Sequence, residues 1–169
     1  MLWTTRSKQV RLSLRTAGQL ALAGGALGEL PRVEHAFAFM REWCVAEGAI
    51  LPVDSLRQVL EALCASGHVD KADALLRRAR YQGAAGSPAG PSPGKAAGDR
   101  IYGCGIKLAA PDVACYNAVL GGLLGASRMA EAGQLLAEME EEDGVEASPE
   151  TLALFIASPK GALGVRQTA

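Results

Sequence analysis

Residue types that commonly build catalytic or metal sites are scarce in this chain of 169 residues. It has only two histidines, His35 and His68, and neither stands at ligand spacing from a cysteine. No Gly-x-Ser-x-Gly and no His-Glu-x-x-His motif is present. The sequence therefore predicts no enzyme, no catalytic residue and no cofactor.

Paired cysteines are missing as well. The four cysteines form no CxxC pair, and they are Cys44, Cys64, Cys104 and Cys115. Disulfides persist mainly in oxidising compartments, where their cysteines come in pairs. We expect reduced thiols in a reducing compartment, with three of them packed in or beside helices: Cys44, Cys64 and Cys115. Metal binding is the minor alternative.

Long apolar runs are absent, because glycines and charges interrupt every candidate for a membrane span. Aromatic residues are also few, at 5% of the chain against 49% for all hydrophobic residues. Leucine and alanine must therefore form most of the core. Both residues favour helix, and the chain has few β-branched runs, so the composition indicates an all-α protein without a membrane segment.

Acidic residues do not occur before Glu29, whereas Arg6, Lys8, Arg11 and Arg15 all lie in this first stretch. Serine, threonine and arginine without acids are typical of an organellar transit peptide. The alternative is the end of an earlier helical repeat. Residues 1–16 are therefore either a transit-like basic segment or a repeat remnant.

The most informative stretch is residues 111–144, which predicts two helices joined by a short turn at residues 125–127. Apolar residues recur there at spacings of three and four, which is the pattern of one buried helix face. The first helix carries Tyr116, Val119, Leu120, Leu123 and Leu124, and the second carries Met129, Ala132, Leu135, Leu136 and Met139. Such a hairpin exposes apolar surface on both flanks, so further copies are expected.

The same pattern stands sixty residues earlier, position for position, and it predicts a second hairpin over residues 53–83. A shift of a further thirty-six residues gives a degenerate first hairpin over residues 17–52, with Leu20, Ala23 and Leu27 as its first stripe. Its second stripe is then Val33, Ala36, Phe39, Met40 and Trp43. Residues 111–148 form the third hairpin, and residues 149–169 start a partial fourth. Residues 84–110, rich in glycine, serine and proline, are predicted to be a flexible insertion.

Two charged clusters are expected to be solvated. Arg77, Arg78 and Arg80 are predicted to end a helix, where cations suit the helix dipole. The acidic run Glu138, Glu140, Glu141, Glu142 and Asp143 is predicted to cover the outer end of another helix.

The segment PDVACYNAVLGGLLGASRMAEAGQLLAEM resembles the pentatricopeptide repeat, which has a Pro-Asp-Val start, a Tyr-Asn pair and a small-residue turn. LEALCASGHVDKADALL resembles the same motif. The resemblance implies an α-solenoid, a right-handed superhelix of about three helix-turn-helix repeats and a partial fourth. It also implies binding of single-stranded RNA in a mitochondrion or chloroplast, one base per repeat.

In that family, the residue after the motif's tyrosine and the last residue of the repeat read one base together. Carried onto this sequence, the reading pairs are Asn117 with Ser148, Arg57 with Asp112 and Ala21 with Pro52. Only Asn117 and Ser148 look usable, because both side chains donate and accept hydrogen bonds. The positions that usually hold an aliphatic wall are instead Gly18, Asp54, Ala114 and Glu150.

The balance of charge leaves two functions open. Residues 1–100 hold 13 Lys and Arg against 9 Asp and Glu, while residues 101–169 hold 4 against 9. A nearly neutral chain binds nucleic acid weakly by itself. The first hypothesis is an organellar RNA-binding protein of RNA processing, stability or translation. It is either part of a longer RNA binder or held among the proteins of a ribonucleoprotein or ribosome. The alternative is a protein-binding scaffold of the tetratricopeptide type.

Overall fold

The computed structural model describes residues 13–85, 106–141 and 143–157. In this part of the chain, helices make up all of the regular secondary structure except two strands of two residues each. In chain order the elements are α1 (Leu14–Ala26), α2 (Leu30–Glu47), β1 (Ile50–Leu51), α3 (Val53–Ala65), α4 (Val69–Ala85), β2 (Lys107–Leu108), α5 (Val113–Gly125), α6 (Met129–Glu141) and α7 (Pro149–Ala157). The all-α prediction is confirmed.

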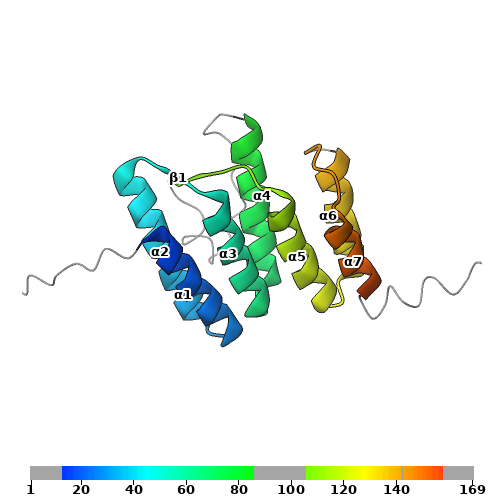
Figure 1. The fold of residues 1–169 in the computed structure, drawn as a ribbon, viewed down its shortest axis with the longest axis horizontal. Helices are drawn as coiled ribbons and strands as arrows, with labels where there is room; N and C mark the ends of the chain where they lie inside the picture. Colours follow the sequence, from blue (N-terminus) through cyan, green and yellow to red (C-terminus); the bar gives the residue numbers. More distant parts are fainter. Residues whose placement is uncertain (1–12, 86–105, 142, 158–169) are drawn as a thin grey trace, which may run out of the picture.

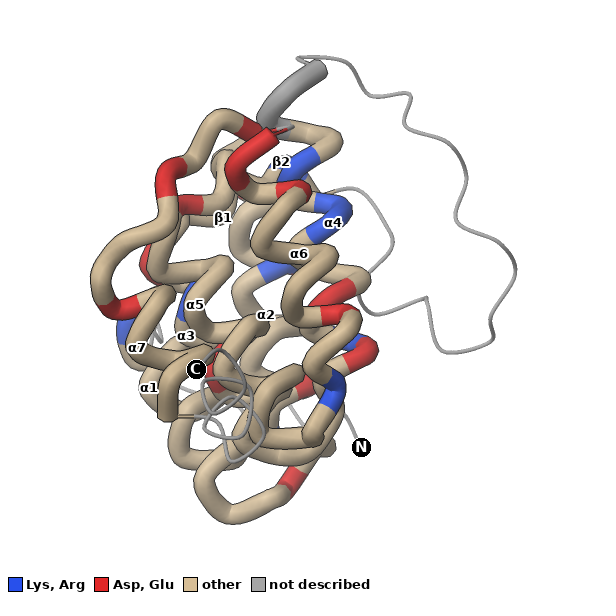
Figure 2. The backbone as a smooth tube through the Cα atoms, turned by 90° about the vertical axis from the view of Figure 1, so that its right-hand side faces the viewer, with Lys and Arg blue, Asp and Glu red and all other residues tan. Residues whose placement is uncertain are grey.

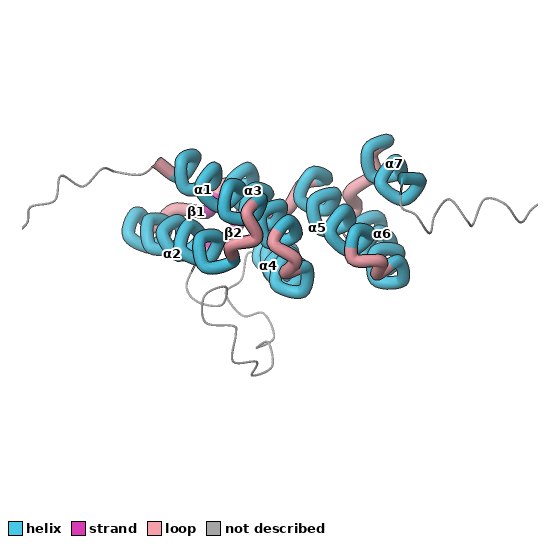
Figure 3. The backbone as a smooth tube through the Cα atoms, turned by 90° about the horizontal axis from the view of Figure 1, so that it is seen from below, coloured by secondary structure: helices cyan, strands magenta, loops and turns pink. Residues whose placement is uncertain are grey.

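The helices form two layers, which are seen end-on in Figure 3. The first helices of the pairs, α1, α3, α5 and α7, pack side by side in one layer. The second helices, α2, α4 and α6, form the other. Figure 1 shows that the first helices run in the same direction, with the turns of the pairs at one end. Among the described helices, none combines the length and the apolar character needed to cross a bilayer.

The three turns inside the pairs have the same geometry. Gly28 and Gly67 have positive φ values of 69° and 80°, and Ser127 occupies the equivalent place with a φ of 61°. In each turn, the next amide donates to a carbonyl five residues back, as in His68 to Leu63 and Arg128 to Leu123, both at 2.8 Å. This hydrogen bond closes the helix end, and it reverses the chain onto its own apolar face.

The offset between hairpins differs from the prediction at one place. α3 and α5 begin sixty residues apart, as predicted, but α1 begins at Leu14 and α3 at Val53, which is 39 residues and not 36. The predicted first stripe is therefore wrong: Leu20 is 44% exposed and Leu27 is 64% exposed. Small residues occupy the buried positions of α1 instead, namely Ala17, Gly18, Ala21, Gly24 and Gly25. In α2, Phe37 and Cys44 are buried where Phe39 and Trp43 were expected.

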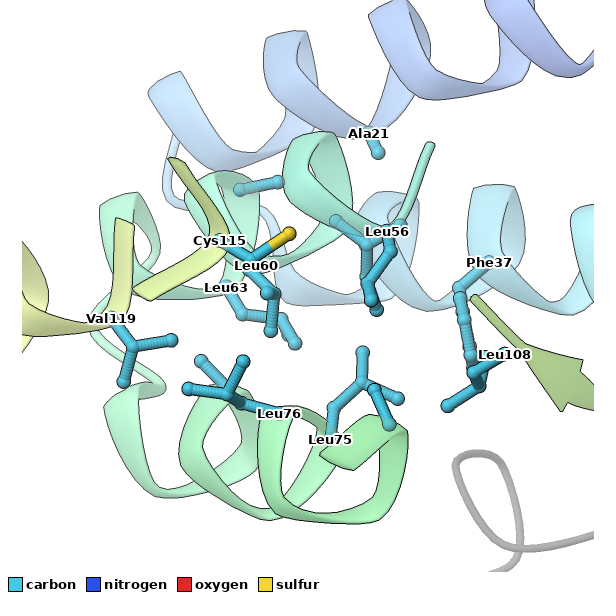
Figure 4. Packing of buried hydrophobic residues seen from close by; sticks show 14 of the residues in the cluster. Ala21, Phe37, Leu56, Leu60, Leu63, Leu75, Leu76, Leu108, Cys115 and Val119 are labelled. Carbon is cyan, nitrogen blue, oxygen red and sulfur yellow. The ribbon is translucent and has the colours of Figure 1, made fainter. Parts of the chain in front are cut away.

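The core lies between the two layers and is built mainly from leucine. In Figure 4, Leu56, Leu60 and Leu63 of α3 lie opposite Leu75 and Leu76 of α4. The stripes predicted for α3, α4, α5 and α6 are buried, apart from half-buried Cys64, Met129 and Leu136. The core is therefore built mainly from leucine, as the leucine-rich and aromatic-poor sequence predicts.

The end of the predicted flexible insertion belongs to the packed structure. β2 pairs in parallel with β1, with Ile50 opposite Lys107 and Leu51 opposite Leu108. The Gln82 side-chain carbonyl accepts a hydrogen bond from the Leu108 amide at 2.8 Å, and Ile106 and Leu108 are buried. The prediction included residues 106–110 in the insertion because glycines precede Ile106 and Leu108, and two apolar residues are too few to mark a packed segment in the sequence. The remainder, residues 86–105, lies outside the described residues, as do residues 1–12 and 158–169.

Glycine lets the first helices approach each other closely. A Cβ atom at Gly25 of α1 would lie 2.6 Å from the Cα atom and 2.5 Å from the carbonyl oxygen of Ala62 in α3. A Cβ atom at Gly122 of α5 would lie 2.6 Å from the Cys64 sulfur atom. Each contact is shorter than real carbon atoms allow, so glycine sets the spacing of this layer.

We expect Gly25→Ala to lower the free energy of unfolding by roughly 1 to 3 kcal/mol, because the added methyl group overlaps rigid backbone of α3. Chemical denaturation followed by circular dichroism measures the change. Gly133→Ala in α6 is the matched control, since nothing lies within 4 Å of that position. It should raise stability by up to about 1 kcal/mol through helix propensity. Unchanged stability of Gly25→Ala would contradict the close approach of α1 and α3.

Candidate nucleic-acid interface

The residues predicted to read bases lie on the layer of first helices. Arg57 is the fifth residue of α3 and Asn117 is the fifth residue of α5. Their predicted partners, Asp112 and Ser148, stand directly before the first residues of α5 and α7. Each partner is thus at the start of the next first helix along the chain.

Asn117 and Ser148 are brought together. The Asn117 Nδ2 atom donates to the Ser148 Oγ atom at 3.5 Å, at the limit of a hydrogen bond. The Asn117 Oδ1 atom accepts a shorter bond of 2.6 Å from the hydroxyl of Thr151, which is fully buried. The amide of Asn117 therefore joins α5 to α7, and its Nδ2 group keeps hydrogen-bonding capacity to spare.

The start of α7 explains why these side chains meet. The Ser148 Oγ atom accepts a hydrogen bond from the Thr151 amide at 3.2 Å, and the Thr151 Oγ1 atom accepts one from the Ser148 amide at 3.1 Å. This reciprocal pair is a capping box with threonine in the place of the usual glutamate. It fixes both hydroxyls beside Asn117. Thr151 was missed in the sequence, although its spacing of three from Ser148 was a usable signal.

The structure does not bring Arg57 and Asp112 together. The Arg57 Nη1 atom donates to Glu61, one turn along α3, at 2.7 Å. The Asp112 carboxylate caps α5 instead, and it accepts from the Cys115 amide at 2.9 Å. In the described contacts, no hydrogen bond joins Arg57 to Asp112. These two residues have local structural partners, so the second predicted reader is not assembled.

The corrected offset also removes the first predicted reader. Ala21 is fully buried, and the fifth residue of α1 is Gly18. A Cβ atom at Gly18 would lie 1.6 Å from the Oε1 atom of Gln58, so the Gln58 amide occupies this place on the layer. Gln58 was not identified from the sequence as a surface residue of this layer, because its position depends on the space that Gly18 leaves on the neighbouring helix. Among the wall positions, Asp54 and Glu150 are exposed, and Arg15 takes the place assigned to Gly18.

Many of the described Lys and Arg side chains form ion pairs with acidic residues. Lys71 pairs with Glu34 at 2.7 Å, and Arg128 pairs with Asp70 at 2.6 Å and with Glu131 at 2.5 Å. Figure 2 places the cations of α4 next to acidic residues of α6. Phosphate attraction depends on unpaired positive charge. The described surface therefore offers little of the electrostatic attraction on which nucleic-acid affinity depends.

Four residues of the two charged clusters predicted to be solvated form one partly buried network instead: Arg77, Arg80, Glu138 and Asp143. Glu140 and Glu141 are exposed, as predicted, and Glu142 lies outside the described residues. α4 continues past Arg80 to Ala85, so these arginines do not end the helix. The Glu138 carboxylate accepts from Arg77 at 2.8 Å and from Arg80 at 2.7 Å, and the Arg80 Nε atom lies 2.6 Å from Asp143. Tyr116 donates its hydroxyl to Asp143 at 2.5 Å. The network ties α4, α5 and α6 together, and sixty-one residues of chain separate Arg77 from Glu138.

The environment of this network sets the pKa values of its members. Burial by itself would raise the pKa of Glu138, but the hydrogen bonds and charges of Arg80 and Arg77 outweigh it and hold that pKa below 4.5. Burial and the hydrogen bond to Asp143 raise the pKa of Tyr116. Glu138 therefore stays ionised and Tyr116 stays neutral over a wide pH range, which suits a structural role.

A small cleft lies at the turn end of α3 and α5. Its volume is about 450 Å³, and its lining consists of Cys64, Ala65, Gly67, Val69, Gly121, Gly122, Gly125 and Ala126. Burial and the charge of Glu61 raise the pKa of the Cys64 thiol to about 12, so this thiol is a poor nucleophile. In the described ranges, no three His, Cys, Asp or Glu side chains gather as a metal site. Cys44, Cys64 and Cys115 are free thiols.

Comparison of the chain with models of known protein families finds no match, and neither does comparison with curated protein sequences. The structure defines only a broad class: in its described part, the chain is an all-helical protein built from helix pairs in two layers. The resemblance of residues 111–148 to the pentatricopeptide repeat stays a prediction.

We expect Glu138→Gln to lower the free energy of unfolding at neutral pH by roughly 1 to 3 kcal/mol, because Arg77 and Arg80 lose a charged partner. The folded state depresses the pKa of Glu138, so its contribution is full above about pH 4.5 and is lost as the pH falls below that value. The difference between variant and wild type should therefore shrink in acid. Urea titrations at several pH values measure it.

Glu42→Gln on the exposed side of α2 makes the same charge change outside the network. This control should follow the wild-type pH profile. A constant difference between Glu138→Gln and wild type from pH 7 to about pH 3 would contradict the assigned role of Glu138.

Proposed function

We propose that this chain is a helical-repeat protein that binds single-stranded RNA in an organelle and acts in RNA processing, stability or translation. In this proposal the two layers of helix pairs are a short α-solenoid, and the layer of first helices is the RNA-binding surface. The residue assignments come from the resemblance to the pentatricopeptide repeat, and a mitochondrion or chloroplast follows from the same resemblance.

The observation that carries the proposal is the position of Asn117 and Ser148. The resemblance assigns these two residues to one base, although 31 positions separate them in the chain. They lie in hydrogen-bond contact, with Asn117 on α5 and Ser148 directly before α7. An amide and a hydroxyl side by side offer donors and acceptors to the edge of a base, as recognition of an unpaired nucleotide requires.

The proposal includes weak affinity for the isolated chain. Arg57 pairs with Glu61, and Asp54 and Glu150 bring negative charge to the same layer. A base placed beside these carboxylates would lose favourable contacts, and phosphates would meet few free cations. Binding inside a larger ribonucleoprotein, where other proteins supply contacts, fits this surface better than independent binding.

The ion pairs also favour a second candidate, a protein-binding scaffold of the tetratricopeptide type. A surface whose cations are already paired suits a peptide or helix better than a polyanion. The apolar and uncharged lining of the cleft near Cys64 points in the same direction. Retention of RNA at low salt separates the two candidates.

We expect the purified chain to bind single-stranded RNA weakly and to lose this binding as salt rises, because phosphate contacts release counterions. Filter binding with a set of single-stranded RNAs across a salt series measures both effects. Removal of residues 1–16, which include Arg6, Lys8, Arg11 and Arg15, should weaken binding more than Asn117→Ala does. Complete lack of retention at low salt would exclude RNA binding by this chain and leave the scaffold.

Two control variants separate reading of a base from support of the fold. Thr151→Val removes the hydroxyl that bonds Asn117 but leaves the Asn117 amide in place. Gln134→Ala truncates a similar amide on α6, in the other layer. If Asn117 contacts RNA, Asn117→Ala should change the preference among RNA sequences, whereas Thr151→Val and Gln134→Ala should not. The same change in all three variants would show that Asn117 acts only through the packing of α7.

A further inference from the structure

Both ends of the described layer of first helices leave apolar side chains exposed. At one end, α1 exposes Gln19, Leu20 and Ala23, which we term the N-terminal end face. At the other, α7 exposes Leu152, Ala153 and Ile156, which we term the C-terminal end face. Ile156 is 75% exposed and Leu152 is 52% exposed. Figure 1 shows that these two helices lie at opposite ends of the row.

The N-terminal end face has the composition of a surface that receives a helix elsewhere in the same molecule. Where α1 packs on α3, Gln58 and Ala62 of α3 contact Gly18 and Gly25 of α1. The residues 39 positions earlier, at the same places in α1, are Gln19 and Ala23. α1 thus presents to the outside the same pair of residue types that α3 uses to hold its neighbour. A further first helix would find the same contacts there.

The C-terminal end face has the features of the helix that would be received. Ala153 is the fifth residue of α7, the place that Gly18 has in α1. A small side chain at this place permits the close approach seen between α1 and α3. Ile156, three residues further along α7, is exposed and supplies apolar area that nothing covers in the described part of the chain.

Charge favours contact between unlike ends. In the helices themselves, α1 carries only Arg15 and α7 carries only Glu150. Two N-terminal ends would repel each other, as would two C-terminal ends. A basic end against an acidic end is attractive.

We propose that these faces bind each other between two copies of the chain, so that α7 of one copy packs on α1 of the next and continues the row of first helices. The contact joins two different surfaces and is therefore heterologous. A third copy can add in the same way, so the product is an open row whose length grows with protein concentration. A contact between only two helices, α7 of one copy and α1 of the next, buries a modest area, so the association is weak and is broken by salt.

Sedimentation velocity of the full chain without RNA tests this contact, from the lowest detectable to the highest soluble concentration. We expect wild type to shift to larger species as concentration rises. Ala23→Glu blocks the N-terminal end face and Ile156→Glu blocks the C-terminal end face. Each variant alone should associate about tenfold more weakly than wild type or not at all. Mixed together, they should form a dimer and nothing larger, because one good face of each remains.

Tyr81→Glu is the matched control, since Tyr81 is 60% exposed on α4 and lies outside both end faces. It should associate like wild type, and circular dichroism should show that all three variants stay folded. A monomer at every concentration would overturn the proposal. So would self-association of Ala23→Glu alone that Ile156→Glu lacks, because that result would mean that two C-terminal end faces pair with each other.

Discussion

The close packing of the first helices is the constraint on which the rest of the structure depends. Gly25 of α1 lies against the Ala62 backbone of α3, and Gly122 of α5 lies against the Cys64 side chain of α3, so glycine permits the close approach at both contacts. The second helices then cover one side of this layer, and the leucines between the layers are removed from water. Small residues in α1, which look like a loss of pattern in the sequence, are what permits this approach.

Long-range charge pairing is the second feature that shapes the molecule. Glu138 and Asp143 hold Arg77 and Arg80, and Tyr116 joins them from α5. The acidic run and the arginine cluster looked like separate solvated surfaces, because each is far from the other in the chain. Their pairing stabilises contacts among three helices. It also takes positive charge away from any role in binding a polyanion.

The layer of first helices combines both features. Asn117 and Ser148 meet because α7 begins with a capping box directly beside α5. Arg57 and Asp112 do not meet, because each has a nearer partner on its own helix. Local hydrogen bonds thus decide which of two similar candidate pairs is assembled. On this layer, the hydrogen-bonded side chains of Asn117 and Ser148 lie between α5 and α7, and Gln58 supplies a polar group between α1 and α3.

The sequence by itself determined the helices of the second and third hairpins, their turns and their buried stripes, since the spacing of leucines and the turn residues are local properties. It placed the first hairpin three residues out of register, because alanine and glycine carry too little hydrophobic signal to mark a buried face. Tertiary structure alone decided that Gly18 makes room for Gln58 and that the arginines of α4 find the acids of α6. These contacts join residues distant in the chain, and only the packing of helices brings them within bonding distance.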